Sequence, residues 1–258
     1  LDHTFGGKLT SCLVNPRACY ETELNYLPTP SAKKLAVVGA GPAGLTFATI
    51  AAERGHEVHL YDAAAEIGGQ LNLAKQVPGK EEFHETLRYF NSRIETTAVN
   101  LHLNTRFDTS TLAENGFDEV VVATGILPRK IKIEGIDHKK VCNYIDILTG
   151  KVEAGKKVAI IGAGGIGFDV AEFLTHEGES TALNTPAFMK EWGVDMDHKT
   201  VGGLKEMVSE PSPRQVWMMQ RSKGKLGARL GKTTGWIHRA ALVKKQVTMI
   251  NDASYDRI

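Results

Sequence analysis

The sequence has few cysteines, no long apolar run and almost no net charge, and each of these absences excludes a class of protein. The three cysteines, Cys12, Cys19 and Cys142, are too few and too scattered for a disulfide framework, which favours a reducing, cytoplasmic compartment. No apolar stretch reaches the roughly 18 residues of a membrane helix, and the start lacks a secretory leader. A net charge of +1 gives no broad basic field, so we expect neither nucleic-acid nor membrane partners.

What the sequence contains is ordinary globular composition, with 42% hydrophobic and 24% charged residues in 258. Residues 1–31 are polar, contain Gly and Pro, and predict a linker or docking segment. The absence of an initiator Met indicates a piece of a longer protein. Beyond residue 31 strands alternate with helices, and we expect an α/β fold. Two Rossmann-like dinucleotide-binding domains, neither necessarily complete, are predicted in tandem over 32–128 and 129–258.

Apolar runs and helical spacing predict the same order of elements in both halves. In the first half we expect strands at 34–38, 56–61, 99–103 and 119–123, the last of them buried, and helices at 42–54 and 81–97. In the second half we expect strands at 157–161, 216–219 and 247–250 and a helix at 168–175. Residues 177–213 lack periodicity and are far longer than a normal helix-to-strand connection, so they predict an insertion.

The first glycine-rich loop, GAGPAG at 39–44, stands between a predicted strand and helix, where dinucleotide binding requires it. Gly39 permits the tight turn, Gly41 lets the backbone approach a pyrophosphate, and Gly44 allows close packing of helix and strand. The helix start then offers free N–H groups to the phosphates. Asp62 follows at about the 20-residue spacing of an acid that binds ribose hydroxyls. The alternative is a structural turn with a surface aspartate.

Two features after this loop bear on the nucleotide. Gly68 and Gly69, followed by Gln70, resemble the second flavin contact of two-dinucleotide flavoproteins. Alone the glycine pair indicates a turn, but together with Asp62 it favours FAD. The sequence ATG at 123–125 resembles the crossing from the flavin domain to the pyridine-nucleotide domain, where a small turn must pass the cofactor closely. An ordinary strand-end turn is the alternative.

The second glycine-rich loop, GAGGIG at 162–167, repeats the design, but the acid is replaced. The next predicted strand ends in QRSKGK at 220–225. An acid there favours a free ribose 2′-OH, whereas Arg and Lys accommodate a 2′-phosphate. The hypothesis is therefore NADPH over NADH, with Arg221 as principal contact and Lys223 or Lys225 assisting. A solvated basic turn is the alternative.

Two further runs, GGKLTSCLVNPRA at 6–18 and LGKTTGWIHR at 230–239, extend these motifs to the whole chain. Together they resemble the NADPH-dependent 2,4-dienoyl-CoA reductases, which are trimethylamine dehydrogenase-like iron–sulfur flavoproteins. The resemblance implies that Cys12 is the fourth ligand of a 4Fe–4S cluster whose other cysteines lie upstream, and that Cys19 is not a ligand. It also implies a preceding flavin barrel with FMN, the dienoyl-CoA substrate and the catalytic acid, and a following segment that completes the FAD domain.

By the same resemblance, electrons run from NADPH to FAD, through the cluster to FMN, and then to an unsaturated fatty acyl-CoA. No side chain here is a convincing general acid or base, so no catalytic residue is predicted, and His238 is expected to be structural. One cysteine cannot hold a cluster, and we expect this piece alone to be inactive. Alternatives are a relative acting on another enone or amine, and a noncatalytic NADPH-binding module. The implied FAD contacts are Gly39, Gly41, Ala43, Gly44, Asp62, Gly69, Gln70, Lys80 and Phe107, and the NADPH contacts are Gly162, Gly164, Gly165, Gly167, Arg221, Lys223 and Lys225.

Overall fold

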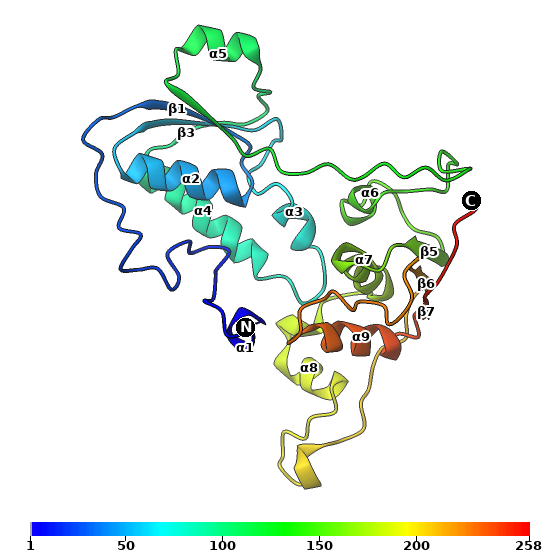
Figure 1. Cartoon of the computed structure of the whole chain (residues 1–258). Coiled ribbons are helices and arrows are strands. Elements are labelled where there is room, and N and C mark those ends of the chain that lie inside the picture. The colour runs from blue at the N-terminus through cyan, green and yellow to red at the C-terminus, as the bar shows by residue number, and fades with distance from the viewer. Residues whose placement is uncertain (1) are drawn as a thin grey trace. The chain divides into compact units, whose positions relative to one another are not determined.

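The computed structural model describes residues 2–258 and divides them into two compact units (Figure 1). The first unit comprises His3–Lys75 and Glu82–Leu127. The second comprises Asp2, Gln76–Glu81 and Pro128–Ile258. The short segment Gln76–Glu81 therefore packs with the second unit, although its neighbours on both sides in the sequence belong to the first.

The first unit is built on a four-stranded parallel sheet. Its strands are β1 (Lys34–Val38), β2 (Glu57–Tyr61), β3 (Asn100–His102) and β4 (Glu119–Val122), in the order β3-β2-β1-β4. Val38 at the end of β1 lies opposite Tyr61 of β2 and Val122 of β4. Because parallel strands end at the same edge of the sheet, the chain leaving β1 emerges between the ends of its two neighbours.

Two helices, α2 (Pro42–Glu53) and α4 (Phe83–Thr97), pack together along one face of this sheet (Figure 1). Their apolar stripes meet the strands in the core of the unit, where Leu45 and Phe90 are buried against Leu60 and its neighbours. Burying such side chains contributes about 1.5–3 kcal/mol each. The remaining helices are short: α3 (Leu71–Ala74), α5 (Thr109–Asn115) and α1 (Asp2–Phe5), whose first residue belongs to the second unit.

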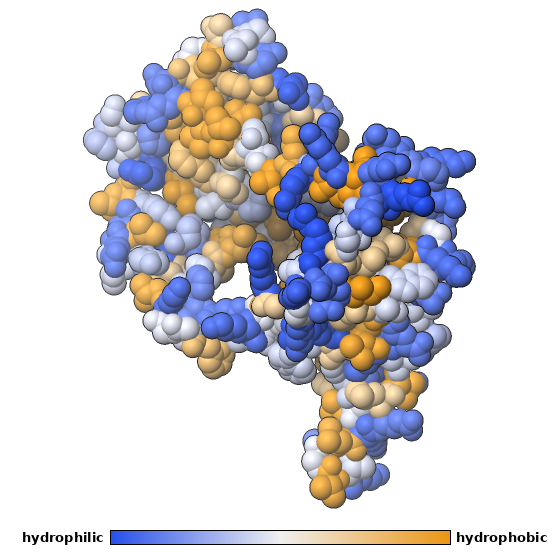
Figure 2. Space-filling view, turned by 45° about the vertical axis from the view of Figure 1, so that its right-hand side comes forward, coloured by the Kyte–Doolittle hydropathy of each residue, from blue (hydrophilic) through white to orange (hydrophobic). Residues whose placement is uncertain are grey.

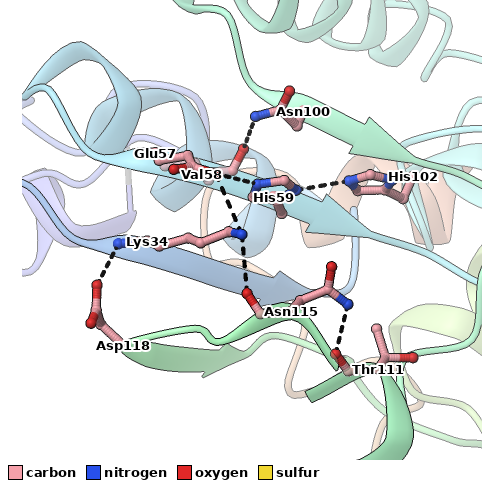
Figure 3. A network of polar contacts seen from close by, with 9 residues as sticks. All are labelled: Lys34, Glu57, Val58, His59, Asn100, His102, Thr111, Asn115 and Asp118. Atoms are coloured by element: carbon pink, nitrogen blue, oxygen red, sulfur yellow. Dashed lines mark hydrogen bonds and ion pairs between the residues drawn. The ribbon is translucent and has the colours of Figure 1, made fainter. Parts of the chain in front are cut away.

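The other face of the sheet carries polar and aromatic side chains, which Figure 3 shows from close by. The Lys34 ammonium donates to the Asn115 carbonyl at 3.0 Å, and its backbone N–H donates to the Asp118 carboxylate at 2.7 Å. His59 and His102 share a hydrogen bond of 3.0 Å between their rings. The two Lys34 bonds fasten the segment that contains α5 to β1, and the histidine pair joins β2 to β3.

The second unit repeats the plan with three parallel strands in the order β5-β6-β7. The helix α7 packs against α6, α9 and the sheet, and Phe168, Met218 and Leu242 are buried between them. The elements are β5 (Lys157–Ile161), β6 (Gln215–Met219), β7 (Thr248–Ile250), α6 (Tyr144–Leu148), α7 (Gly165–Thr175), α8 (Thr185–Glu191), α9 (Gly235–Lys244) and the 3₁₀ turns η1 (Thr181–Leu183) and η2 (Val201–Gly203).

A long excursion joins α7 to β6, whereas residues 54–56 alone join α2 to β2 in the first unit. The excursion contains η1, α8 and η2. The buried Asp195 carboxylate holds it together by accepting bonds from the backbone N–H groups of Lys199 and Thr200, and from the Lys205 ammonium at 2.7 Å. That ammonium keeps the pKa of Asp195 well below its ordinary value. Apolar side chains lie on the surface of the excursion (Figure 2), among them Val201 and Leu204.

The α/β fold with parallel sheets is confirmed, and β1 and β5 have the predicted bounds. The prediction of a buried strand at 119–123 was wrong, because β4 lies at the edge of its sheet and Val122 is 74% exposed. Periodicity also missed α5, α6, α8 and α9. Within residues 2–258 the structure contains no helix that is both long and apolar enough to span a membrane.

Two candidate dinucleotide-binding sites

The first glycine-rich loop joins β1 to α2 in a conformation that two of its glycines make possible. Gly39 has φ +108° and donates its N–H to the Tyr61 carbonyl at 2.8 Å. A β-carbon at Gly39 would collide with the Ala123 carbonyl, and one at Gly44 would collide with the Gly39 carbonyl. Glycine at both positions therefore brings the helix start close to the sheet edge.

Gly41 differs from these two glycines, because a β-carbon there would meet no atom within 4 Å. It is the N-cap residue of α2, and no side chain caps the helix. Pro42 follows at the first helical position, where a missing N–H is harmless. The uncapped helix start, with its positive dipole end and open space in front of Gly41, fits a pyrophosphate. Ala43 is exposed in the first turn of the same helix.

Asp62 directly follows β2 and lies beside the loop. One carboxylate oxygen accepts the Ala40 N–H at 2.7 Å, and the other accepts the Ala64 N–H at 2.8 Å. These two bonds fix the carboxylate at the carboxyl edge of the sheet. Since each ionised carboxylate oxygen offers about two acceptor sites, Asp62 keeps capacity to accept hydrogen bonds from ribose hydroxyls. The residues present thus fit the nucleotide end of FAD.

The glycine pair after Asp62 packs directly against the first loop. The Gly68 N–H donates to the Ala40 carbonyl at 2.7 Å, and a β-carbon at Gly69 would lie 3.2 Å from the α-carbon of Gly41. Both glycines have positive φ. The structure therefore brings the two predicted FAD segments together, and Gln70 follows them on the surface with its side-chain amide 3.5 Å from the Ile126 carbonyl.

The two remaining predicted FAD contacts, Phe107 and Lys80, each contact another side chain. Phe107 packs edge-on against the Tyr61 ring, with 5.0 Å between centroids. Lys80 belongs to the segment that packs with the second unit, where its ammonium donates to the Asp169 carboxylate at 2.6 Å. Lys80 is therefore placed with the residues of the second candidate site.

The second glycine-rich loop repeats the geometry of the first between β5 and α7. Gly162 has φ +114° and donates to the Met219 carbonyl at 2.8 Å, as Gly39 does to Tyr61. A β-carbon at Gly167 would collide with the Gly162 carbonyl. At Gly164 and Gly165 a β-carbon would meet nothing within 4 Å, and no side chain caps α7. This helix start therefore also fits a pyrophosphate.

The residue that follows β6 distinguishes the second site. Gln220 directly follows β6 as Asp62 follows β2, and its side-chain amide donates to the carbonyls of Ser222 and Gly224. The turn that it holds displays Arg221, Lys223 and Lys225 on the surface. No acid occupies the position after the strand, so the second site differs from the first in charge as well as in sequence.

A partly buried cluster on α7 was missed by the sequence reasoning. Glu172 accepts a hydrogen bond from His238 of α9 at 2.7 Å, and Asp169, one turn earlier, binds Lys80. The bond to Glu172 raises the pKa of His238, against the opposing effect of burial. The available signal was the pair of acids three residues apart on the helix after a glycine loop. His238 thus joins α9 to α7, which agrees with a structural role.

Cys12, the predicted cluster ligand, is exposed in the N-terminal segment. Backbone N–H groups of Asn15 and Val14 lower the pKa of its thiol, which favours the thiolate that iron requires. Among residues 2–258, no group of three or more His, Cys, Asp or Glu side chains is placed to hold a metal ion. Any cluster on Cys12 would need ligands from outside this chain.

Cys12 also lines a cavity of about 1040 Å³ beside α2.

Comparison with known proteins agrees with this geometry. Residues 33–258 match the family model described as pyridine nucleotide-disulphide oxidoreductase. The chain belongs to this family of FAD- and NAD(P)H-dependent oxidoreductase domains. The curated relatives include a metal reductase of Desulforamulus reducens, 31% identical over 98% of this chain, and an NADH oxidase of Thermoanaerobacter brockii, 32% identical over 86%. The chain spans only 38% and 32% of their lengths.

Solved structures extend the comparison to the whole fold. A 2-naphthoyl-CoA reductase in complex with 2-naphthoyl-CoA has a TM-score of 0.80 and 29% identity, and the match covers 99% of this chain and 34% of that one. An amine oxidase of Pseudomonas geniculata has a TM-score of 0.74 at 20% identity, covering 100% and 36% of the two chains, and shares the fold. In each case this chain corresponds to about a third of the longer protein.

Proposed function

We propose that this chain is the electron-entry part of an NADPH-dependent reductase of the 2,4-dienoyl-CoA reductase type. The observation that carries the proposal is the pair of uncapped helix starts, one beside a fixed carboxylate and the other beside a basic turn. The first suits FAD and the second suits NADPH. The chemistry that these groups supply when bound is hydride transfer from the nicotinamide to the flavin.

The protein's own part in this step is binding and positioning. Backbone N–H groups at the starts of α2 and α7 would hold the two pyrophosphates, and Gly41 and Gly164 leave room for them. Asp62 would accept hydrogen bonds from a ribose of FAD. At the second site Arg221 would face the 2′-phosphate, with Lys223 or Lys225 assisting, because guanidinium and ammonium groups stabilise a doubly charged phosphate.

The onward path and the substrate are proposed from similarity. The similarity to a 2-naphthoyl-CoA reductase supports a CoA thioester with a conjugated acyl group as the final acceptor. The exposed Cys12, with its lowered thiol pKa, would serve as the fourth ligand of a 4Fe–4S cluster. The other ligands, and a flavin barrel with FMN, would lie in other parts of the same protein, and the cluster would supply electron transfer between the flavins. That barrel would bind the dienoyl-CoA, and a cytoplasmic location is proposed with it.

The test uses the full-length protein, purified without oxygen and with its bound flavins. NADPH should bleach the visible absorption of the oxidised flavin, and NADH should do so only at much higher concentration. A 2,4-dienoyl-CoA added next should restore the absorption, whereas ferric citrate, an acceptor suggested by the metal-reductase relative, should be much slower. A protein that binds NADPH without flavin reduction would contradict the proposal, as would restoration by iron and by no thioester.

Arg221→Ala is the variant for the nucleotide assignment. Losing a charge-assisted contact should weaken NADPH binding by about 10- to 100-fold and leave NADH binding nearly unchanged. Lys156→Ala is the matched control, since Lys156 is exposed just before β5 at the opposite edge of the sheet. It removes one positive charge from the same unit without touching the basic turn. Equal effects of both substitutions would point to a general charge effect and contradict a specific contact.

A further inference from the structure

A groove runs along α9 next to the basic turn of the second unit, and of its lining residues the function proposed above uses only Lys225. We name it the α9 groove. Its volume is about 730 Å³. It is lined by Trp236, Arg239, Ala240 and Val243 of α9, by Met249 and Asn251 of β7 and the residue after it, and by Gly224, Lys225 and Leu226.

The walls of the α9 groove are apolar and held in place. Trp236 is 57% exposed, yet its indole N–H donates to the Thr233 carbonyl at 3.0 Å. Val243 is exposed beside it, and Leu226 is buried at the base. A large aromatic ring that is exposed and also fixed in orientation is suited to stacking on a flat partner.

The charge of the α9 groove is positive. Lys225 and Arg239 are the charged residues among those that line it, and no acid is among them. The Arg239 guanidinium is tethered by a bond of 3.1 Å to the Gly227 carbonyl. On the adjoining turn the Asp252 carboxylate lies 3.9 Å from the Lys223 ammonium. The groove therefore favours a flat ring that carries negative charge.

The α9 groove is also continuous with the second candidate site. Lys225 lines the groove and ends the basic turn that begins directly after β6. Asn251 directly follows β7, at the same carboxyl edge of the sheet as the glycine-rich loop. A dinucleotide whose pyrophosphate lies at the start of α7 would have its adenosine half within reach of this edge.

We propose that the α9 groove binds the adenine ring of NADPH, stacked on Trp236, with Lys225 and Arg239 beside the ribose 2′-phosphate. This inference rests on the proposed function and deepens it, because it adds Trp236 and Arg239 as residues that select the phosphorylated nucleotide. A nucleotide without the 2′-phosphate would keep the stacking but lose the interaction with the two cations.

The experiment measures tryptophan fluorescence of the full-length protein while adenosine 2′,5′-bisphosphate is added. Binding should quench the emission. Trp236→Phe should keep most of the binding but remove the quenching, and Trp236→Ala should weaken binding by about tenfold. The matched control is Trp192→Phe, because Trp192 lies in the excursion under the Lys244 ammonium, outside the α9 groove. This variant should retain the quenching.

Calorimetry with the same probe distinguishes a failure of the groove assignment from a failure of the proposed function. If adenosine 2′,5′-bisphosphate binds and NADPH reduces the flavin, but Trp236→Ala binds as tightly as the wild type, the groove assignment is overturned and the proposed function stands. If neither the probe nor NADPH binds, the proposed function fails and the groove assignment fails with it. Lys225→Ala should weaken binding of the bisphosphate by about tenfold and should hardly change binding of adenosine 5′-monophosphate. An equal loss for both would also overturn the assignment.

Discussion

Gln220 takes in the second unit the place that Asp62 takes in the first. Each residue directly follows the strand that pairs with the one leading into its glycine-rich loop. Each backbone N–H donates to the carbonyl that ends the next strand, that of Ile250 or of His102. The Asp62 carboxylate is turned to the Ala40 N–H in the loop, whereas the Gln220 amide is turned to its own basic turn. The two units thus share the same backbone arrangement, but the ribose position has a carboxylate in the first unit and a neutral amide beside a basic turn in the second.

Introducing a carboxylate at position 220 should shift the nucleotide preference of the second site from NADPH towards NADH. In Gln220→Asp the new carboxylate should accept ribose hydroxyls and repel a 2′-phosphate. We expect NADPH binding to weaken by about 10- to 100-fold and NADH binding to tighten or stay unchanged. The dissociation constants of both nucleotides, measured on the full-length protein, check this. Gln220→Asn, which is neutral, is the control. A similar loss of NADPH affinity in that variant would show that the charge of the carboxylate is not the cause.

Gly44 and Gly41 should respond to alanine in different ways. In Gly44→Ala the new methyl group would collide with the Gly39 carbonyl, so α2 must shift, and overpacking of this kind costs about 1–3 kcal/mol of unfolding free energy. In Gly41→Ala the methyl group meets open space, so the thermal midpoint without FAD should hardly change while FAD affinity falls. Calorimetric melting and flavin titration measure the two effects. A large stability loss in Gly41→Ala would contradict the assignment of a phosphate to that space.

His238 should stabilise the second unit at acidic pH. Its hydrogen bond to Glu172 raises the pKa of His238 above the value of about 6.5 that it has when unfolded. The folded state therefore holds the proton more tightly, and this stability is fully present below about pH 6.5. It is lost as the pH rises through the folded pKa. Thermal midpoints of wild type and His238→Gln should differ most at acidic pH and converge at alkaline pH. The opposite trend would contradict a stabilising bond between protonated His238 and Glu172.

His102 should have the reverse effect in the first unit. Burial and, secondly, the neighbouring His59 lower the pKa of His102, so folding favours its neutral ring. Its contribution to stability is present above about pH 6.5 and is lost as the pH falls through the folded pKa. Replacing it by Gln should flatten the decline of the melting temperature on acidification. NMR titration of the His102 ring protons checks the direction independently, and a pKa above that of an exposed histidine would contradict it.

The sequence alone determined much of the framework. The runs at Lys34–Val38 and Lys157–Ile161, each followed by spaced glycines, identified the central parts of both units because a strand, a tight turn and a helix leave a strong local pattern. Asp62 could be placed beside the first loop from spacing alone. The short helix α5 also had local signals that went unused, namely Asp108 as N-cap residue and Gly116 as C-cap residue.

Only the tertiary structure decided which distant residues meet. Lys80 packs with the second unit and binds Asp169, and the sequence separation of the two residues gives no hint of it. The exposure of Val122 depends on the place of β4 at the sheet edge, which a single strand's composition does not encode. Local patterns record the conformation of the backbone, whereas the contacts of a side chain depend on which elements pack together. For that reason the glycine loops were visible in the sequence, and the cluster on α7 and the α9 groove were not.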